Sequence, residues 1–79
     1  MIHAYILVIM QPGFSNKAVD EITKQEKVVK TSVIAGEYDI IIRVNVKTLH
    51  ELHELTMIFH KIKGVKKTIT SLIEKELSI

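Results

Sequence analysis

Cysteine is absent from this sequence of 79 residues, and proline occurs only once. Without cysteine there are no disulfides, no thiolate metal ligands and no cysteine nucleophile. The lack of disulfides fits a reducing, cytoplasmic location. Glycine occurs at only three widely separated positions, so the sequence has no glycine-rich loop of the kind that holds phosphate groups.

Long hydrophobic runs and a strong excess of charge are absent as well. No apolar run approaches the roughly 20 residues of a membrane span. The apolar segment from Met1 to Met10 is short, lacks a basic leader and precedes Pro12, which indicates a strand and not a signal peptide. The net charge is +2, and the one basic cluster, at residues 61–67, contains no arginine and no aromatic residue. We therefore expect no direct binding to nucleic acid or to a membrane.

Aliphatic residues dominate the composition instead. Hydrophobic residues make up 47% of the chain, and only 5% of the chain is aromatic. The length predicts a single domain over residues 1–79, and so short a chain buries only about 60% of its unfolded surface. This much Ile, Val and Leu exceeds what one small monomer easily hides, so the composition predicts self-association.

Two runs of β-branched residues flank a polar break at residues 36–39, which predicts a β-hairpin. The strands are expected over residues 28–35 and 39–46, with Gly36 in the bend because glycine adopts positive φ without steric cost. In the second of these strands, one face is uniformly apolar and the other is mixed. The apolar face holds Ile40, Ile42, Val44 and Val46, and the mixed face holds Ile41, Arg43 and Asn45.

A strand and a helix are expected on each side of the hairpin. Residues 2–11 predict a strand whose two faces are both mainly apolar, so both should be buried. Ser15 is the expected N-cap of a short helix, and Thr48 with Glu51 predicts a capping box at the start of a longer one. Gly64 is expected to end that second helix in a left-handed conformation. The predicted bounds are Ile2–Gln11 and Val65–Ile73 for the strands, Asn16–Gln25 and Leu49–Lys63 for the helices, and Glu74–Ile79 for a charged tail.

The resulting order, β-α-β-β-α-β, predicts the α+β ferredoxin-like plait. This fold is a four-stranded antiparallel sheet with both helices on one face. The other face lacks helices, yet the first and third strands are apolar on both sides or nearly so, which predicts a homodimer with two sheets packed face to face. The second helix is expected to face the sheet with Leu49, Leu52, Leu55, Ile58, Phe59 and Ile62.

The hairpin loop holds the densest set of groups able to recognise a small molecule. Its N–H groups near Gly36 can bind a carboxylate, and the side chain of Glu37 or Asp39 can accept hydrogen bonds from an ammonium group. The alternative is structural: Asp39 accepts hydrogen bonds within the turn, and the Tyr38 ring covers the end of the sheet. The candidate ligand-binding residues of the loop are Gly36, Glu37, Tyr38 and Asp39.

Other polar clusters are less informative. Thr68, Thr70 and Ser71 form a hydroxyl-rich patch on the last strand, either as ligand donors or as ordinary strand formers. Histidines on the second helix are three and seven residues apart, which lacks the i,i+4 pair and third ligand of a metal site. We therefore expect no metal, no cofactor and no catalytic residue. The histidine stripe comprises His50, His53 and His60, and no role is assigned to it.

The segment Val33–Val46, with Ala35-Gly36-Glu37-Tyr38-Asp39-Ile40 at its centre, resembles the Gly-x-Tyr/Asp-Asp signature of the Lrp/AsnC family of leucine-responsive regulators. The Gly64-Val65 pair and the Thr68-x-Thr70 strand also resemble the C-terminal effector domain of that family, called RAM. The resemblance covers nearly the whole chain, up to about Glu76.

This resemblance implies a ferredoxin-like fold, sheet-to-sheet dimers and often rings of four dimers. It also implies that a free amino acid binds at the junction between dimers, where the hairpin loop and the hydroxyls of the last strand form the pocket. Full-length members carry a helix-turn-helix domain that this sequence lacks, so we expect a stand-alone RAM protein without direct DNA binding. Its expected role is to sense an amino acid and to modulate transcription by assembly with full-length Lrp/AsnC regulators.

Two other functions fit the sequence. Plait dimers of this size include monooxygenases and isomerases, and Tyr5 and His3 are the candidates to point into a cavity between the sheets. The second and third strands are expected to supply no partner for them. The remaining alternative is a structural oligomerisation unit that binds no ligand.

Overall fold

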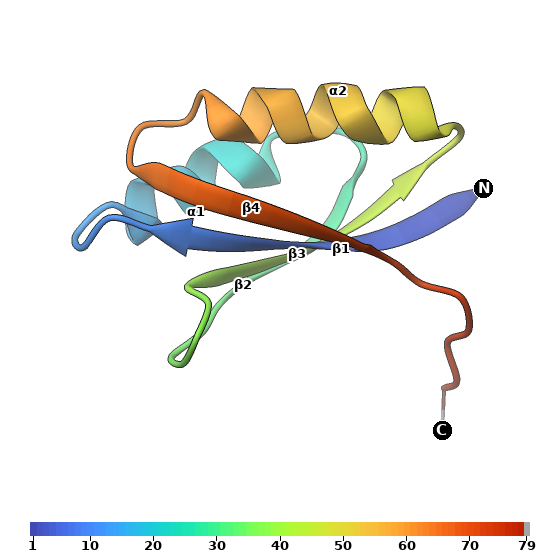
Figure 1. Cartoon of the computed structure of the whole chain (residues 1–79), viewed down its shortest axis with the longest axis horizontal. Helices are drawn as coiled ribbons and strands as arrows, with labels where there is room; N and C mark the ends of the chain where they lie inside the picture. The colour runs from blue at the N-terminus through green and yellow to red at the C-terminus, as the bar shows by residue number, and fades with distance from the viewer. Residues whose placement is uncertain (79) are drawn as a thin grey trace.

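The computed structural model describes residues 1–78, which form one four-stranded antiparallel sheet and two helices (Figure 1). The strand order in the sheet is β2-β3-β1-β4, so β1 and β3 are central and β2 and β4 are edges. The predicted α+β ferredoxin-like plait is confirmed. The elements are β1 (Ile2–Met10), α1 (Ser15–Thr23), β2 (Val28–Val33), β3 (Ile40–Val46), α2 (Leu49–His60) and β4 (Val65–Leu72).

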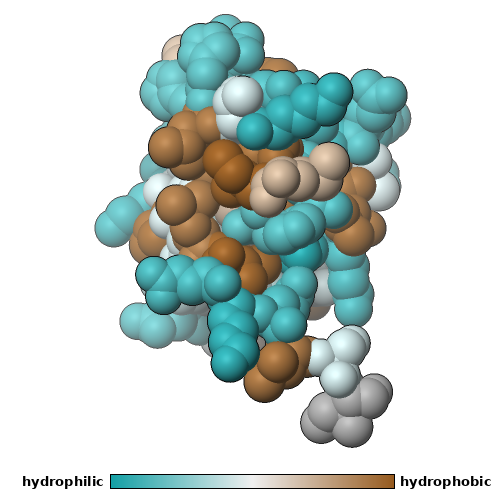
Figure 2. Space-filling view, turned by 90° about the vertical axis from the view of Figure 1, so that its right-hand side faces the viewer, coloured by the Kyte–Doolittle hydropathy of each residue, from teal (hydrophilic) through white to brown (hydrophobic). Residues whose placement is uncertain are grey.

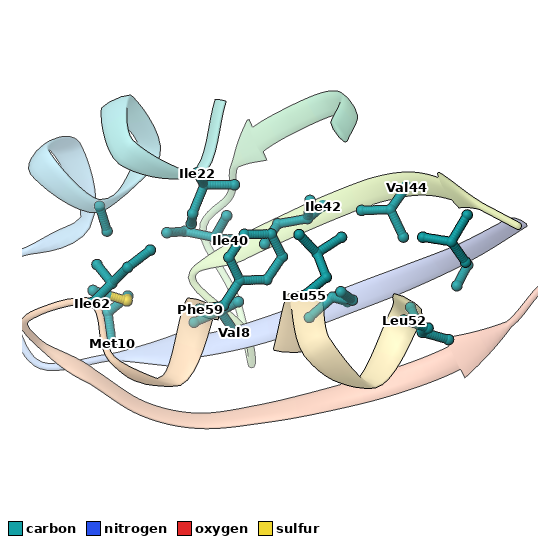
Figure 3. Close-up of a cluster of buried hydrophobic side chains, with 14 residues drawn as sticks. Val8, Met10, Ile22, Ile40, Ile42, Val44, Leu52, Leu55, Phe59 and Ile62 are labelled. Carbon is teal, nitrogen blue, oxygen red and sulfur yellow. The ribbon is translucent and has the colours of Figure 1, made fainter. Parts of the chain in front are cut away.

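The hydrophobic core lies between the sheet and the two helices, which lie on the same side of it (Figure 1). Strand β3 alternates between buried and half-buried residues, as the sequence pattern predicts. Leu52, Leu55 and Phe59 extend from α2 toward Ile42 and its neighbours in the sheet (Figure 3). The side chains of this core are all apolar, because no polar or charged residue in the described chain is buried.

Strand β1 is covered on one face only, so the expected burial of both faces is wrong for a single chain. The helix-facing residues are buried, whereas Tyr5 on the other face is 38% exposed. Leu7 and Ile9 on that face are half-buried because only neighbouring strands shelter them. We call this helix-free surface the open face. It is formed by His3, Tyr5, Leu7 and Ile9 of β1, Ile41, Arg43 and Asn45 of β3, and their neighbours on β2 and β4, which include Lys30, Ser32, Ile69 and Ser71.

The start of α2 confirms the predicted capping box, with one difference. The Glu51 N–H donates to the Thr48 hydroxyl at 3.1 Å. The Glu51 carboxylate reaches back to the N–H of Lys47, one residue before the cap, at 3.2 Å. The helix ends at His60 and not at the predicted Lys63, and Gly64, with a φ of 92°, lies in the turn before β4.

Two further predictions about the helices are wrong. Ser15 is the first residue of α1 and not its N-cap, and the capping position is occupied by Phe14, which offers no side-chain hydrogen bond. On α2, Leu49 and Ile58 were expected to be buried but are 60% and 43% exposed, because the sheet covers a narrower stripe of the helix. No helix within residues 1–78 is long and apolar enough to cross a bilayer.

Candidate functional site

The hairpin loop lies between β2 and β3 and projects from the sheet as the green bend at the lower left of Figure 1. Gly36 has a φ of 156°, which confirms the predicted positive φ in the bend. Within the described chain, the N–H groups of residues 35–38 donate to no backbone carbonyl. Glu37 is exposed and Tyr38 is half-buried. The loop therefore offers four N–H donors and one solvent-facing carboxylate.

Asp39 fastens this loop to β1. Its N–H donates to the carbonyl of Val8 at 2.9 Å, and its Oδ2 accepts from the N–H of Met10 at 2.7 Å. The strand register shifts between Ile9 and Met10, so the carboxylate satisfies a donor at an irregular point of the β1–β4 pairing. Asp39 therefore has a structural contact, but its donor comes from β1 and not from the N–H groups of the turn, which the structural alternative named.

The hydroxyl-rich patch predicted on β4 is split between the two faces of the sheet. Thr68 and Thr70 lie opposite residues of β1 that face the helices, and Ser71 lies opposite Tyr5 on the open face. Successive strand residues point to opposite sides, so three hydroxyls at these positions cannot share one surface. The Thr68 hydroxyl is also hydrogen-bonded to Nε2 of His60 at 2.8 Å.

Strand β4 is separated from the hairpin by one strand of the sheet, β1. Val8 pairs with Ile40 on one side and with Thr68 on the other, which places β1 between β4 and the end of the hairpin. The loop residues and the hydroxyls of β4 therefore do not form one pocket within a single chain.

The histidines of α2 do not converge on a common point. His53 is exposed, His50 lies 3.4 Å from Glu54, and His60 contacts β4 through Thr68. Within residues 1–78, no three His, Asp or Glu side chains lie close enough together to hold a metal ion.

A polar cluster on the open face was missed by the sequence reasoning. The Arg43 guanidinium binds the Glu76 carboxylate through two hydrogen bonds, Nη2 to Oε1 at 2.7 Å and Nε to Oε2 at 3.4 Å. The Tyr5 hydroxyl donates to the same carboxylate at 3.4 Å, and the Tyr5 ring centre lies 6.0 Å from Cζ of Arg43. Next to this pair, His3 and Arg43 both hydrogen-bond to Oδ1 of Asn45.

One signal in the sequence points to this cluster. Arg43 lies in a strand that is aliphatic apart from Arg43 and Asn45, and a cation on a largely apolar strand requires a counter-ion. The expectation that β3 supplies no partner for His3 or Tyr5 is wrong, because Asn45 and Arg43 contact them. The hydrogen bonds from Arg43 and its positive charge lower the pKa of the Glu76 carboxyl.

Two hollows lie on the surface beside these elements. One, of about 280 Å³, opens on the open face beside Arg43 and Glu76 and extends to Lys30 and Ser32 of β2. The other, of about 480 Å³, lies where β2 and α2 begin, next to the ion pair of Lys27 and Glu51. Hydrogen bonding from the Lys47 N–H lowers the pKa of the Glu51 carboxyl.

Comparison with a family model gives a match along almost the whole chain. The model describes the Lrp/AsnC ligand binding domain, and it matches residues 3–78. Homocitrate synthase from Sulfolobus acidocaldarius is 43% identical over 44 residues, which are 56% of this chain and 9% of that enzyme. The chain thus spans about a tenth of the length of the curated relatives that it matches.

Solved structures share the fold. The crystal structure of FFRP-DM1 is 27% identical, with a TM-score of 0.86, and the alignment covers 92% of this chain and 99% of that one. A transcriptional regulator from Neisseria meningitidis, solved as a complex with L-Met, has a TM-score of 0.85 at 16% identity. The latter alignment covers 99% of this chain and 53% of the regulator, and at that identity it shows the fold alone.

Proposed function

This chain belongs to the Lrp/AsnC ligand-binding domain family, and we propose that it is a sensor of free amino acids whose ligand binds between assembled copies. The match to the ligand-binding domain over residues 3–78 is the observation that carries the proposal. The regulator from Neisseria meningitidis, whose complex with L-Met has the same fold, supports an amino acid as the ligand class. The family is defined by a ligand-binding domain, which argues against the small barrel enzyme as the alternative.

The hairpin loop has the groups that a free amino acid requires. A carboxylate is bound by N–H donors, and those of residues 35–38 point to no other part of the backbone. An ammonium group is bound by acceptors, and Glu37 supplies a solvent-facing carboxylate, while Asp39 is already bonded to Met10. We therefore assign the ammonium contact to Glu37 and the anchoring of the loop to Asp39.

A complete pocket needs a second copy of the chain. Strand β1 separates the loop from β4, and Thr70 and Ser71 point to opposite faces of the sheet, so one chain does not gather the loop and both hydroxyls around one ligand. In the proposed site, the loop of one copy faces β4 of another copy, where the ligand meets either the Thr70 hydroxyl or the Ser71 hydroxyl. Binding then stabilises only the assembly that forms the pocket, which couples the amino acid to the oligomeric state.

The open face is the proposed seam of the basic dimer. Leu7 pairs across the sheet with Ile41 on one side and Ile69 on the other, which gives an aliphatic centre that no helix covers. Burying such a surface against its own copy produces a two-fold homodimer. Higher assemblies, such as a tetramer of dimers, and mixed assembly with a full-length Lrp/AsnC regulator extend this proposal.

A second candidate for the controlled partner is a biosynthetic enzyme. The identity of 43% over 44 residues to a homocitrate synthase favours this candidate, because a related segment lies within a metabolic enzyme. In that case the chain acts on an enzyme by the same ligand-dependent assembly. Co-purification with a tagged chain, with and without amino acids, separates an enzyme partner from a transcriptional regulator.

A thermal-shift screen of the twenty amino acids tests the proposed function. We expect one or a few of them to raise the melting temperature and to shift the oligomer distribution in sedimentation velocity. Glu37→Gln should abolish the response, whereas Glu21→Gln on the exposed surface of α1 should keep it. A screen without any response would leave only the ligand-free oligomerisation unit.

A further inference from the structure

The segment after β4 leaves the sheet on the side opposite the helices (Figure 1). The N–H of Ile73 still donates to the His3 carbonyl at 2.9 Å, which extends the β1–β4 pairing by one step. Residues 74–78 then run outward from the end of the open face and have no regular secondary structure. A second sheet that packs on the open face therefore meets this segment.

Glu76 ties the segment to the open face through Arg43. The Arg43 side chain is only 15% exposed, while that of Glu76 is 47% exposed. The carboxylate lies on the solvent side of the guanidinium and contacts both its Nη2 and Nε atoms. Glu76 thus occupies the position where a partner would otherwise meet an unpaired positive charge.

An unpaired guanidinium at a buried seam is costly. Removing a charge from water costs several kcal/mol unless a partner compensates it, and planar two-pronged pairing with a carboxylate is the best compensation for arginine. Lys30 lines the same hollow as Arg43, so the neighbourhood has an excess of positive charge apart from Glu76. Face-to-face packing of two such surfaces without Glu76 would bring like charges together.

The same segment carries an apolar side chain without shelter. Leu77 is 81% exposed, more than any other large hydrophobic residue in the described chain. Figure 2 looks onto this end of the molecule, where both termini lie, and shows apolar side chains among hydrophilic ones. Four exposed apolar residues lie where β1, β2 and α2 begin and where β4 ends: Met1, Val29, Leu49 and Leu72.

We propose that residues 73–78 form an arm that clasps a second copy of this chain across the open face. Glu76 neutralises Arg43 at the seam, and Leu77 packs on the apolar surface of the partner. The proposal rests on the sheet-to-sheet dimer of the proposed function and adds the element that controls its strength. Two-fold symmetry places two arms in each dimer, so each substitution acts twice.

Sedimentation equilibrium of the full chain and four variants tests the arm. Glu76→Gln keeps the size of the side chain but loses its charge, and we expect it to raise the dimer dissociation constant about tenfold or more. Leu77→Ser and deletion of residues 74–79 should also weaken the dimer, the deletion most. Glu74→Gln is the matched control, since it removes an exposed carboxylate from the same segment, and it should leave the constant within about twofold.

The outcomes separate the arm from the dimer itself. Wild-type protein that stays monomeric at micromolar concentration overturns the sheet-to-sheet dimer. A stable wild-type dimer whose constant is unchanged by the deletion overturns the arm and leaves the dimer standing. Circular dichroism of each variant confirms that the fold is retained, so a loss of association cannot be mistaken for unfolding.

A second measurement does not depend on substitutions in the arm. Trypsin cleaves after Lys75, which is exposed in the single chain. If the arm clasps a partner, cleavage at Lys75 slows as the protein concentration rises through the dimer dissociation constant. A cleavage rate that is the same in monomer and dimer contradicts the arm.

Discussion

Ile41 and Ile42 are consecutive residues of β3 with the same side chain, yet they belong to different surfaces. Ile42 is fully buried beneath the helices, whereas Ile41 lies on the open face opposite Leu7 and is half-buried. The apolar residues of the sheet therefore lie on two surfaces. One is covered by α1 and α2 of the same chain, and the other is the open face, which the proposed dimer would bury.

The two faces also differ in polarity. The covered face holds no buried polar residue, and its stability comes from apolar packing. The open face combines an aliphatic centre with a polar corner at His3, Tyr5, Arg43 and Asn45. A buried ion pair adds little to the stability of a core. In the proposed interface between two copies, however, any packing arrangement that separates the two charges costs free energy, so the pair favours one arrangement over others. The predictions below test this division between fold and assembly.

The largest loss of stability is expected when a side chain on the covered face is shortened. Ile42→Ala leaves a cavity beneath α2 and should lower the free energy of unfolding by about 2–5 kcal/mol. Ile41→Ala removes the same atoms from the open face and should cost less than about 1 kcal/mol in dilute monomer, while it weakens association. Urea denaturation at nanomolar concentration measures the free energy of unfolding, and sedimentation measures the association. An equal loss of free energy of unfolding in the two variants would contradict the assignment of Ile42 to the fold and of Ile41 to assembly.

The division into two faces was predictable from the sequence because strand periodicity is local. Alternation in β3 and the apolar sides of β1 identify one covered and one open surface without any long-range information. The same alternation separates Thr70 from Ser71, so their assignment to one hydroxyl patch could have been rejected before the structure was known.

Other features depended on contacts that no local pattern encodes. Arg43 and Glu76 are 33 residues apart, and the tail that carries Glu76 has no periodicity of its own. Ser15 looked like an N-cap by residue type, but the chain enters α1 one residue earlier because Phe14 packs against the core. The proposed ligand contacts of Gly36, Glu37 and Tyr38 involve a second copy of the chain, and contacts between copies leave no periodic pattern in the sequence.

The next largest effect concerns the turn that joins α2 to β4 on the covered side. Gly64 has a φ of 92°, and a Cβ there would collide with the side chain of Phe14. Gly64→Ala should cost about 2–4 kcal/mol, since backbone strain and overpacking add. Gly13→Ala is the matched control, with a φ of 88° and open space around it, and should cost only about 1–2 kcal/mol of strain. Thermal unfolding of both variants measures the difference, and equal costs would mean that the packing on Phe14 is unimportant.

A smaller effect is expected where α2 begins over the covered face. Thr48→Ala removes the acceptor of the Glu51 N–H and should destabilise the fold by about 1 kcal/mol. Ser15→Ala changes the residue that the sequence suggests as a cap but that makes no capping hydrogen bond, so its effect should stay within about 0.5 kcal/mol. Urea denaturation resolves the two, and a larger loss for Ser15→Ala would reverse the assignment of caps.

The smallest effect is expected in the polar corner of the open face, and pH isolates it. Hydrogen bonds from the Arg43 guanidinium lower the pKa of the Glu76 carboxyl below its value in the unfolded chain. A carboxyl whose pKa is lowered by folding stabilises the folded state above the unfolded value, about 4.3, and this contribution is lost as pH falls through the folded pKa. The melting temperatures of wild-type protein and Glu76→Gln should therefore differ by a constant amount from pH 7 to about pH 5 and converge toward pH 3.

The charged and titratable groups that face Glu76 are Arg43 from β3, Tyr5 and His3 from β1, and Lys30 from β2. All four are present in both proteins, but only the wild-type protein has a carboxylate for the Arg43 guanidinium to stabilise. Glu74→Gln alters the same tail but does not contact Arg43, and its melting temperature should follow that of wild-type protein at every pH. If the difference in melting temperature between wild-type protein and Glu76→Gln is unchanged at pH 3, the substitution alters stability through packing and not through charge. The ion pair of Arg43 and Glu76 would then contribute nothing to the stability of the open face, and any binding of the arm to a second copy would depend on Leu77 alone.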